Sequence, residues 1–277
     1  MAAGPGSTPF SSAMRLVPDG PDRFHAELGA TWTVGGGRAH GGLMLALLTN
    51  AGLTVLRERL GTDVPAPDPV AVSAEYLRAP VVGPAEIGAH VVKTGRTVSV
   101  VRVELHQGGT LMLSATVTAG RLPAGGGEPA WADLPALAAE PPPGARSTVE
   151  HANAVPLSGA CEVVLDPETD GYLRGERGEP VVRGWARPFG EDPDVLFAVL
   201  AGDILPPTVF HLGRPGWAPT VQLTVLLRGR PAPGWLRLEA VSRVVADGWF
   251  DEDYTVVDTE GRLVCQARQI ALLPRRG

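Results

Sequence analysis

One carboxylate interrupts an apolar run in the second half of the chain. Residues 194–207 read DVLFAVLAGDILPP, and Asp203 stands there among Leu, Val, Ala, Phe and Ile. A carboxylate buried without a partner is strongly unfavourable, and burial raises its pKa because the charged form loses its hydration. A raised pKa suits a general base that works near neutral pH. Asp203 is therefore a candidate catalytic base, or else a group that accepts hydrogen bonds from a nearby loop.

Two more polar residues fall on apolar faces of predicted strands. Gln269 lies in RLVCQARQI and shares one strand face with small and apolar residues, namely Leu263, Cys265, Ala267, Ala271 and Leu273. A buried amide needs hydrogen-bond partners. Thr220 begins another predicted strand, and Gln222 and Thr224 lie on the same predicted face as alternatives to it.

An acid, a hydroxyl and an amide can hold one water molecule. The carboxylate would take a proton from the water, and the other two groups would fix its orientation. A protein nucleophile is poorly supported, because no Gly-x-Ser-x-Gly motif occurs and Cys161 and Cys265 sit in core-like strands. We therefore predict Asp203, Thr220 and Gln269 as the catalytic set.

A second group of candidates begins the first predicted helix, in AHGGLMLALL at residues 39–48. Gly41 and Gly42 would let a substrate approach closely, and N–H groups at a helix start can stabilise an oxyanion. His40 is either a capping and packing group or an acid-base group. We expect His40, Gly41 and Gly42 to bind substrate.

Two apolar helices must position these residues. We expect them at Gly42 to about Leu60 and at Pro193 to Leu205. Asp192 is the predicted N-cap of the second helix, with Pro193 at its first position and Pro206-Pro207 at its end. Asp203 would then lie in the last turn, where the helix dipole raises the pKa of a carboxylate.

The two halves of the chain repeat one pattern. PVAVSAEYLRAPVVG (69–83) matches PTVQLTVLLRGRPAPG (219–234) with a shift of 150, and GGTLMLSATVTAG (108–120) matches EGRLVCQARQIAL (260–272) with a shift of 152. The alignment pairs Asp203, Thr220 and Gln269 with Ala51, Val70 and Val117. We therefore expect one site, built in the second half only.

Each half reads as a strand, an apolar helix and four antiparallel strands. A helix that is apolar on nearly every face must be wrapped, and a sheet curled around one helix is the hotdog arrangement. We predict an α+β double hotdog, with two antiparallel sheets each wrapped around a long apolar helix. The segment 121–150 holds six Pro and four Gly, which predicts hotdogs at 1–122 and 151–277 joined by a linker at 123–150. Two independent α+β domains fit less well, because the repeat is so regular.

Composition and net charge argue against several kinds of binding partner and cofactor. The net charge of −6 comes without a basic stripe, which argues against nucleic acid, and no apolar run is long enough for a membrane span. Two cysteines are too few for a disulfide framework or a metal knot. The N-terminal residues lack the pattern of a secretion leader, so we expect a cytoplasmic protein without a metal or redox cofactor.

In the order and spacing of these residues, the chain resembles the type II acyl-CoA thioesterases, and their shorter bacterial members most of all. These are double-hotdog enzymes that hydrolyse fatty acyl-CoA. The family's Asp after the second helix, Thr or Ser on the next strand and Gln on the last strand fall on Asp203, Thr220 and Gln269, and AHGGLMLALL resembles its His-Gly-Gly motif. The resemblance implies an acyl-CoA substrate, attack by water and, by analogy, a homo-oligomer. A thioester is already activated, so one base and good orientation suffice.

Three residues, at two places in the chain, depart from the family pattern. Ile270-Ala271 follow Gln269 where the family commonly has Glu-Gly, and Gly202 precedes the acid where Ser is frequent.

Two other functions stay open. A hotdog hydratase or dehydratase would need a His four or five residues after its Asp, and none follows Asp203 at that spacing. A non-catalytic acyl-CoA-binding protein is the second alternative.

Overall fold

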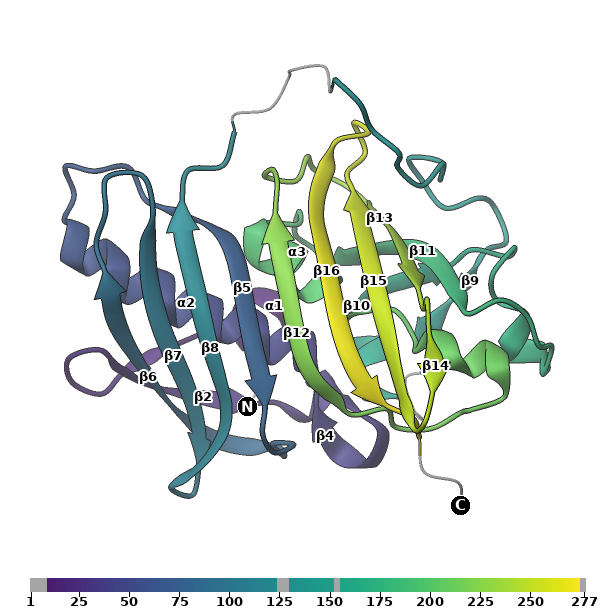
Figure 1. Ribbon diagram of the computed structural model, residues 1–277, viewed down its shortest axis with the longest axis horizontal. Helices are drawn as coiled ribbons and strands as arrows, with labels where there is room; N and C mark the ends of the chain where they lie inside the picture. The colour runs from purple at the N-terminus through teal and green to yellow at the C-terminus, as the bar shows by residue number, and fades with distance from the viewer. Residues whose placement is uncertain (1–8, 124–129, 152–154, 275–277) are drawn as a thin grey trace.

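A 14-stranded antiparallel sheet runs through both halves of the chain, as the computed structural model shows (Figure 1). The structure describes residues 9–123, 130–151 and 155–274. The first half contributes, in spatial order, β1 (Val17–Pro18), β2 (Arg23–Leu28), β6 (Gly83–Lys93), β7 (Ser99–Gln107), β8 (Thr110–Gly120) and β5 (Asp68–Tyr76). The second half continues with β12 (Thr220–Leu227), β16 (Leu263–Leu272), β15 (Trp249–Val257), β13 (Leu236–Val241), β11 (Val181–Pro188), β10 (Cys161–Leu165) and β9 (Arg146–Ser147). Strand β14 (Val245–Ala246) pairs with β15, and β3 (Thr33–Val34) and β4 (Arg38–Ala39) form a separate pair.

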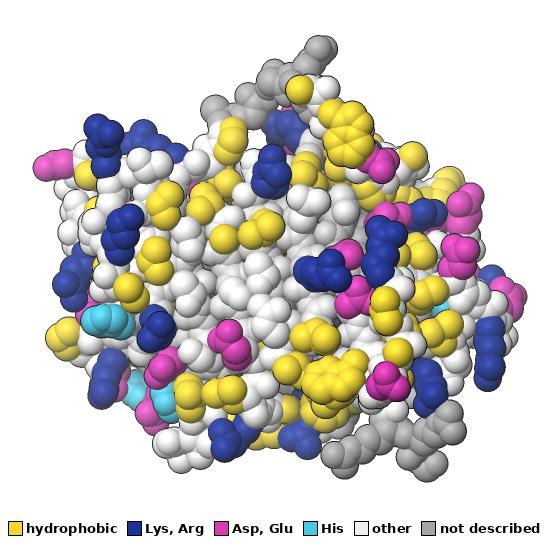
Figure 2. All heavy atoms as spheres, in the orientation of Figure 1, with side chains coloured by type: hydrophobic (Ala, Val, Ile, Leu, Met, Phe, Trp, Pro, Cys, Tyr) yellow, Lys and Arg dark blue, Asp and Glu magenta, His cyan; other side chains and the backbone are white. Residues whose placement is uncertain are grey.

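The two predicted sheets are joined edge to edge, because β5 pairs with β12. Ser73 lies directly opposite Thr224, and their hydroxyl oxygens are 2.9 Å apart. The Gln222 amide donates to both hydroxyls, at 2.9 and 2.8 Å. The face of the sheet over β5 and β12 carries few charged side chains (Figure 2). The edge strands of the two halves thereby become interior strands of one sheet.

The helix α2 (Gly41–Leu60) lies across one face of the first half's strands, behind them in Figure 1, and packs against β5, β6, β7 and β8. Its residues from Gly42 to Leu56 are almost all buried, as expected for a helix wrapped by a sheet. His40 is the N-cap, and Gly61 ends the helix with a φ of 74°, a conformation that favours glycine. The predicted bounds of this helix are therefore close to the observed ones.

The second helix, α3 (Val195–Ala201), is much shorter than predicted. Its N-cap is Asp194, which accepts from the N–H groups of Leu196 and Phe197 at 2.9 and 2.8 Å. The predicted cap, Asp192, instead accepts from the N–H of Gly234. The helix ends at the C-cap Gly202, and the N–H groups of Gly202 and Asp203 bond to the carbonyls three residues earlier, those of Val199 and Leu200. Only glycine fits at position 202, because a Cβ there would lie 2.9 Å from the Cβ of Ala267 in β16. Asp203 therefore follows the helix and does not lie in its last turn.

Short 3₁₀ segments make up much of the rest of the second half. They are η3 (Thr148–His151), η4 (Pro156–Gly159), η5 (Gly171–Arg174) and η6 (Thr208–Leu212); η1 (Ala30–Trp32), η2 (Gly35–Gly37) and the helix α1 (Pro9–Ala13) belong to the first half.

The described part of the predicted linker lies against the second half. The indole N–H of Trp185 donates to the carbonyl of Ala138 at 2.8 Å, and Arg237 donates to the carbonyl of Leu137 at 2.9 Å. Strand β9, at residues 146–147, pairs with β10. Residues 124–129 of the predicted linker lie outside the described residues.

Candidate active site

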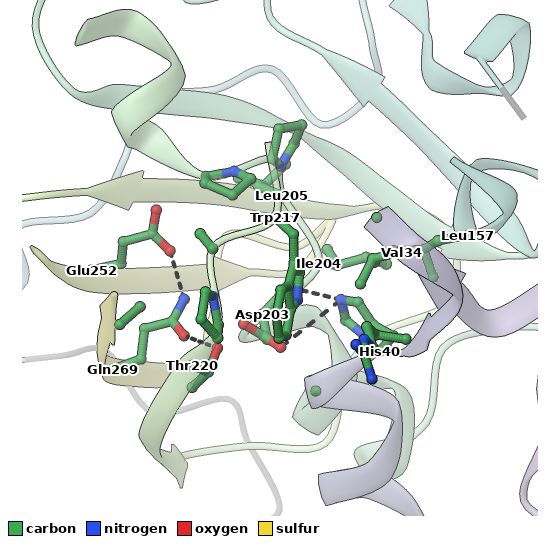
Figure 3. A pocket seen from close by; sticks show the side chains of 18 of the residues that line it. Val34, His40, Leu157, Asp203, Ile204, Leu205, Trp217, Thr220, Glu252 and Gln269 are labelled. Atoms are coloured by element: carbon green, nitrogen blue, oxygen red, sulfur yellow. Dashed lines mark hydrogen bonds and ion pairs between the residues drawn. The ribbon is translucent and has the colours of Figure 1, made fainter. Parts of the chain in front are cut away.

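A cavity of about 690 Å³ is lined by residues from both halves of the chain. Its walls are largely apolar and include Val34, Met44, Leu157, Leu165, Ile204 and Phe210. The predicted residues His40, Asp203, Thr220 and Gln269 line the same cavity, together with Glu252 (Figure 3). An apolar space with a few convergent polar groups is the usual form of a small-molecule site.

Asp203 lies at the point where the end of α3 meets the start of α2. The N–H of Gly42 donates to its Oδ2 at 2.7 Å. A Cβ on Gly41 would lie 2.7 Å from that oxygen, and a Cβ on Gly42 would lie 2.9 Å from the Cβ of Asp203. The two glycines therefore make room for Asp203. This finding adds a second reason for glycine there, beside the predicted approach of a substrate.

Burial raises the pKa of Asp203 to about 7 from its ordinary value of 3.8, although hydrogen bonds from Gly42 and Gln269 lower it. The sequence predicts a raised pKa from burial and from the dipole of the second helix. The structure brings the N-terminus of α2 against the carboxylate, and that helix end favours a negative charge. Burial alone therefore accounts for the direction of the shift, and it leaves a carboxylate that titrates near neutral pH.

Thr220 and Gln269 lie on adjacent strands and are bonded to each other. The Thr220 hydroxyl donates to Oε1 of Gln269 at 2.7 Å, and Nε2 of Gln269 donates to Oε2 of Glu252 at 2.6 Å. Gln269 is buried on the inner face of β16. Its amide acts on the Asp203 carboxylate as well, so the structure brings together all three predicted catalytic residues.

A β-bulge in β12 directs Thr220 into the cavity. Thr220 pairs with Ala271 and Gln222 pairs with Ile270, which leaves Val221 as an extra residue. Residues after the bulge point the opposite way from the predicted alternation, so Gln222 and Thr224 face the outer side, where they bond to Ser73. The prediction that these two share the face of Thr220 is therefore wrong.

A matching bulge in β5 corrects the predicted alignment of the two halves. In β5, Pro69 pairs with Ala119 and Ala71 pairs with Thr118, which leaves Val70 as the extra residue. Thr220 thus corresponds to Pro69 rather than to Val70. The correspondence of Gln269 with Val117 holds, because each pairs with the matching inward residue of the neighbouring strand, Leu223 or Val72.

His40 has the geometry of a cap. Its Nδ1 accepts from the N–H of Leu43 at 3.2 Å, so its proton is on Nε2, which lies 3.0 Å from the backbone oxygen of Asp203 and 3.9 Å from Oδ2. Burial lowers the pKa of His40 to about 4, although the bond to the Asp203 backbone raises it. His40 is therefore neutral at pH 7 and holds the backbone of Asp203 in place. Tyr76 fixes the same helix start by donating to the carbonyl of Gly41 at 3.0 Å.

Glu252 is the site residue that the sequence analysis missed. It lies on β15 directly opposite Gln269 and is 1 % exposed. Burial raises its pKa to about 7, and the charge of Asp203 acts in the same direction. Strand alternation could have found it, because Phe250, Glu252, Tyr254 and Val256 form the inward face of β15, with Glu252 its one acid. The neighbouring acids Asp251 and Asp253 hide that pattern.

The two cysteines lie in the core, away from any catalytic arrangement. Cys161 and Cys265 are free and buried, as predicted, and the Cys265 thiol donates to the carbonyl of Ala198. Among the described residues, no group of three or more His, Cys, Asp or Glu side chains is placed to hold a metal ion. Within the same residues, no helix combines the length and the hydropathy needed to cross a membrane.

Comparison with known proteins gives the family. The model of the acyl-CoA thioesterase N-terminal domain matches residues 28–120, and that of the acyl-CoA thioesterase C-terminal domain matches residues 132–273. Together they span most of the chain. This chain belongs to the acyl-CoA thioesterase family. The thioesterase is thus a hydrolase of acyl thioesters, and the predicted resemblance to the type II enzymes is confirmed.

Individual relatives agree with this assignment. An uncharacterised protein of Mycobacterium tuberculosis is 40 % identical to the thioesterase over 294 residues, which cover 96 % of this chain and 98 % of that protein. A provisionally assigned thioesterase II of Thermobifida fusca YX has 33 % identity and a TM-score of 0.83, covering 98 % of this chain and 99 % of its own. A hot dog fold protein of Alicyclobacillus acidocaldarius, at 22 % identity and a TM-score of 0.78, covers 98 % and 100 % and shares the fold. The predicted double hotdog is confirmed.

Proposed function

We propose that this thioesterase hydrolyses acyl-CoA by direct attack of a water molecule, with Asp203 as the base and Thr220 and Gln269 as the orienting groups. The observation that supports the proposal most is the convergence of these three side chains on one apolar cavity. Apolar walls suit an acyl chain. Arg38 and Arg78 also line the cavity, and guanidinium groups suit the phosphates of CoA.

The reaction then needs two proton transfers. Asp203 takes a proton from the water as the water oxygen bonds to the carbonyl carbon. Gly41 lines the cavity at the first turn of α2, where N–H groups have no partner within the helix, and we assign it to the developing oxyanion. When the tetrahedral intermediate collapses, the C–S bond breaks and the proton passes from Asp203 to the sulfur. The products are the free acid and CoA.

The first prediction tests the base. Purified protein is assayed for release of free CoA from acyl-CoAs of short to long chain. Asp203→Asn should lower kcat by about 100-fold or more, because a positioned general base contributes at least that factor. The matched control is Asp192→Asn, since that carboxylate lies outside the cavity and bonds to Gly234, and it should keep normal turnover. Near-normal hydrolysis by Asp203→Asn would falsify the proposed role.

A further inference from the structure

Glu252 belongs to the cavity wall but is almost fully buried, and its hydrogen bonds go to Thr208 and Gln269. Oε1 accepts from the N–H and the hydroxyl of Thr208, at 2.7 and 2.9 Å, and Oε2 accepts from Nε2 of Gln269 at 2.6 Å. With 1 % of its surface exposed and each oxygen already bonded to a protein group, Glu252 offers almost no surface to a water molecule in the cavity. Its place is one step behind the reacting groups.

The Glu252 carboxylate selects one orientation of the Gln269 amide. An ionised carboxylate only accepts hydrogen bonds, so the amide must turn its NH₂ toward Glu252 and its carbonyl toward Thr220. The reversed amide would place a carbonyl oxygen against the carboxylate, where both atoms are acceptors. In the observed orientation the second N–H of Gln269 is available for Asp203.

The orientation of Gln269 determines what Thr220 can do. Its hydroxyl hydrogen is committed to Oε1 of Gln269, so its oxygen is left as an acceptor toward the cavity. A water molecule that gives one hydrogen to Asp203 can then give its other hydrogen to Thr220. With both hydrogens bound, the water presents a lone pair to the carbonyl carbon of a thioester.

We propose that Glu252 is a positioning residue for hydrolysis: its carboxylate fixes the Gln269 amide, and through it makes Thr220 an acceptor for the attacking water. This inference rests on the proposed function. Thr208, on η6, anchors Glu252 in turn, and its hydroxyl lies 2.6 Å from that of Ser242, directly after β13. The network Ser242–Thr208–Glu252–Gln269–Thr220 thus reaches from the end of β13 to the cavity.

The arrangement requires two ionised carboxylates. The titratable groups coupled to Glu252 are Asp203, after α3, and Tyr254, on the same strand, and burial keeps Tyr254 neutral by raising its pKa well above 10. His40, beside Asp203, is neutral as well. A protonated Glu252 could donate to the Gln269 carbonyl and favour the reversed amide. Below neutral pH, activity should therefore fall through the protonation of two groups rather than one.

The second prediction concerns Glu252→Gln, which keeps the shape of the side chain. The carbonyl of the new amide would serve Thr208, leaving its NH₂ against the NH₂ of Gln269, so the Gln269 amide should reverse. We expect kcat to fall about tenfold or more with KM changed by about twofold or less, because positioning is lost and binding is kept. The acid limb of log kcat against pH should change in slope from about two to about one. Asp253→Asn is the control, since Asp253 lies next on β15 and pairs outward with Arg268.

A second pair of variants separates positioning from folding. Thr208→Val removes the hydroxyl that anchors Glu252 at nearly constant volume, and it should lower kcat. Thr208→Ser keeps the hydroxyl and should keep kcat close to that of the unmodified protein. A neutron crystal structure of Glu252→Gln, which distinguishes the amide N from O, should show Gln269 reversed.

The outcomes are separable from those of the proposed function. Glu252→Gln with normal kcat and an unchanged acid slope, beside an inactive Asp203→Asn, overturns the role of Glu252 and leaves that of Asp203. If the unmodified, folded protein cleaves no acyl-CoA, the proposed function is overturned. In that case the neutron structure still decides the amide orientation, and an unreversed Gln269 rejects the inference.

Discussion

At the scale of single residues, the Asp203 carboxylate is under two opposing influences. Burial disfavours its charge, and the N–H of Gly42 and the amide of Gln269 favour it; burial is the larger effect, so the pKa rises to about 7. A base is most effective when its pKa lies near the working pH. Burial of the Asp203 charge therefore lowers the stability of the folded protein, and it provides a carboxylate that can both accept and release a proton.

The third prediction follows from this cost in stability. A folded-state pKa of about 7 against 3.8 means that the folded protein binds more protons than the unfolded chain between about pH 4 and 7, so this group makes unfolding easier as pH rises through that range. Asp203→Asn removes the penalty and keeps an oxygen for Gly42. It should raise the free energy of unfolding by about 1–3 kcal/mol at pH 8 and by little at pH 4.

The measurement is urea unfolding of both proteins at the two pH values. Asp192→Asn serves again as the control and should show no such dependence on pH. Equal destabilisation of Asp203→Asn at pH 4 and pH 8 would contradict the assigned cause, because a merely structural role for the carboxylate would not depend on its ionisation.

Residue patterns revealed some of these groups and missed others for physical reasons. Asp203 and Gln269 stand out because each is the one polar side chain among apolar neighbours that share its burial. Glu252 meets the same conditions, but Asp251 and Asp253 flank it on the opposite face of the strand, and only the alternation of the strand separates it from them. The capping bond of His40 to Leu43 is local, but its bond to the backbone oxygen of Asp203 joins residues 163 positions apart, which no local pattern contains.

At the scale of elements, close contacts between backbones assemble the site. The start of α2 approaches the end of α3 so closely that a Cβ on Gly42 would lie 2.9 Å from the carbonyl oxygen of Leu200. Gly202 allows α3 to end directly against Ala267 of β16. Small residues at these points bring Asp203 to the first turn of a helix in the other half of the chain.

The fourth prediction tests this contact with Gly42→Ala. The added methyl group must displace the end of α3 or Asp203, because carbonyl oxygen and Cβ cannot stay 2.9 Å apart. We expect a loss of about 1–3 kcal/mol in stability and a fall in kcat of about tenfold or more, since the base moves away from the other groups. Gly88→Ala in β6 is the control, because a Cβ there meets no atom within 4 Å. A Gly42→Ala protein with normal kcat and stability would show that the contact does not position Asp203.

Element boundaries were predictable where local sequence decides them. The first helix ends at Gly61, a local stop, and its prediction is close to the structure. The second helix ends in a tighter turn at Gly202, where the backbone lies against Ala267 of another strand. A stop signal read from Pro206-Pro207, further along the chain, therefore predicts a helix that is too long. The bulge at Val221 likewise depends on pairing with β16, and strand alternation alone placed Gln222 and Thr224 on the wrong face.

At the scale of the whole molecule, two similar halves carry one polar network. Gln269 lies opposite Glu252 in the second half, and in the first half Val117 lies opposite Val101. Thr220 corresponds to Pro69. Where the second half has a hydroxyl, an amide and a carboxylate, the first half has Pro69, Val117 and Val101, and it contributes the start of α2 instead. The site therefore needs both halves, although the fold repeats.

The fifth prediction tests whether the buried amide of Gln269 is tolerated because of its hydrogen-bond partners, and not because of its position in the fold. Val117→Gln puts an amide at the position equivalent to Gln269, where Val117 is fully buried and the opposite residue is Val101. An amide without partners loses its hydrogen bonds to water, so stability should fall by about 2–3 kcal/mol in urea unfolding, without a gain in hydrolysis. Thr116→Gln, next on β8 and exposed, should change stability by about 0.5 kcal/mol or less. If Val117→Gln proved as stable as Thr116→Gln, the first half would accept buried polar groups as readily as the second. The hydrogen-bond partners that Thr208, Glu252 and Thr220 supply would then not explain why the polar network occurs in the second half alone.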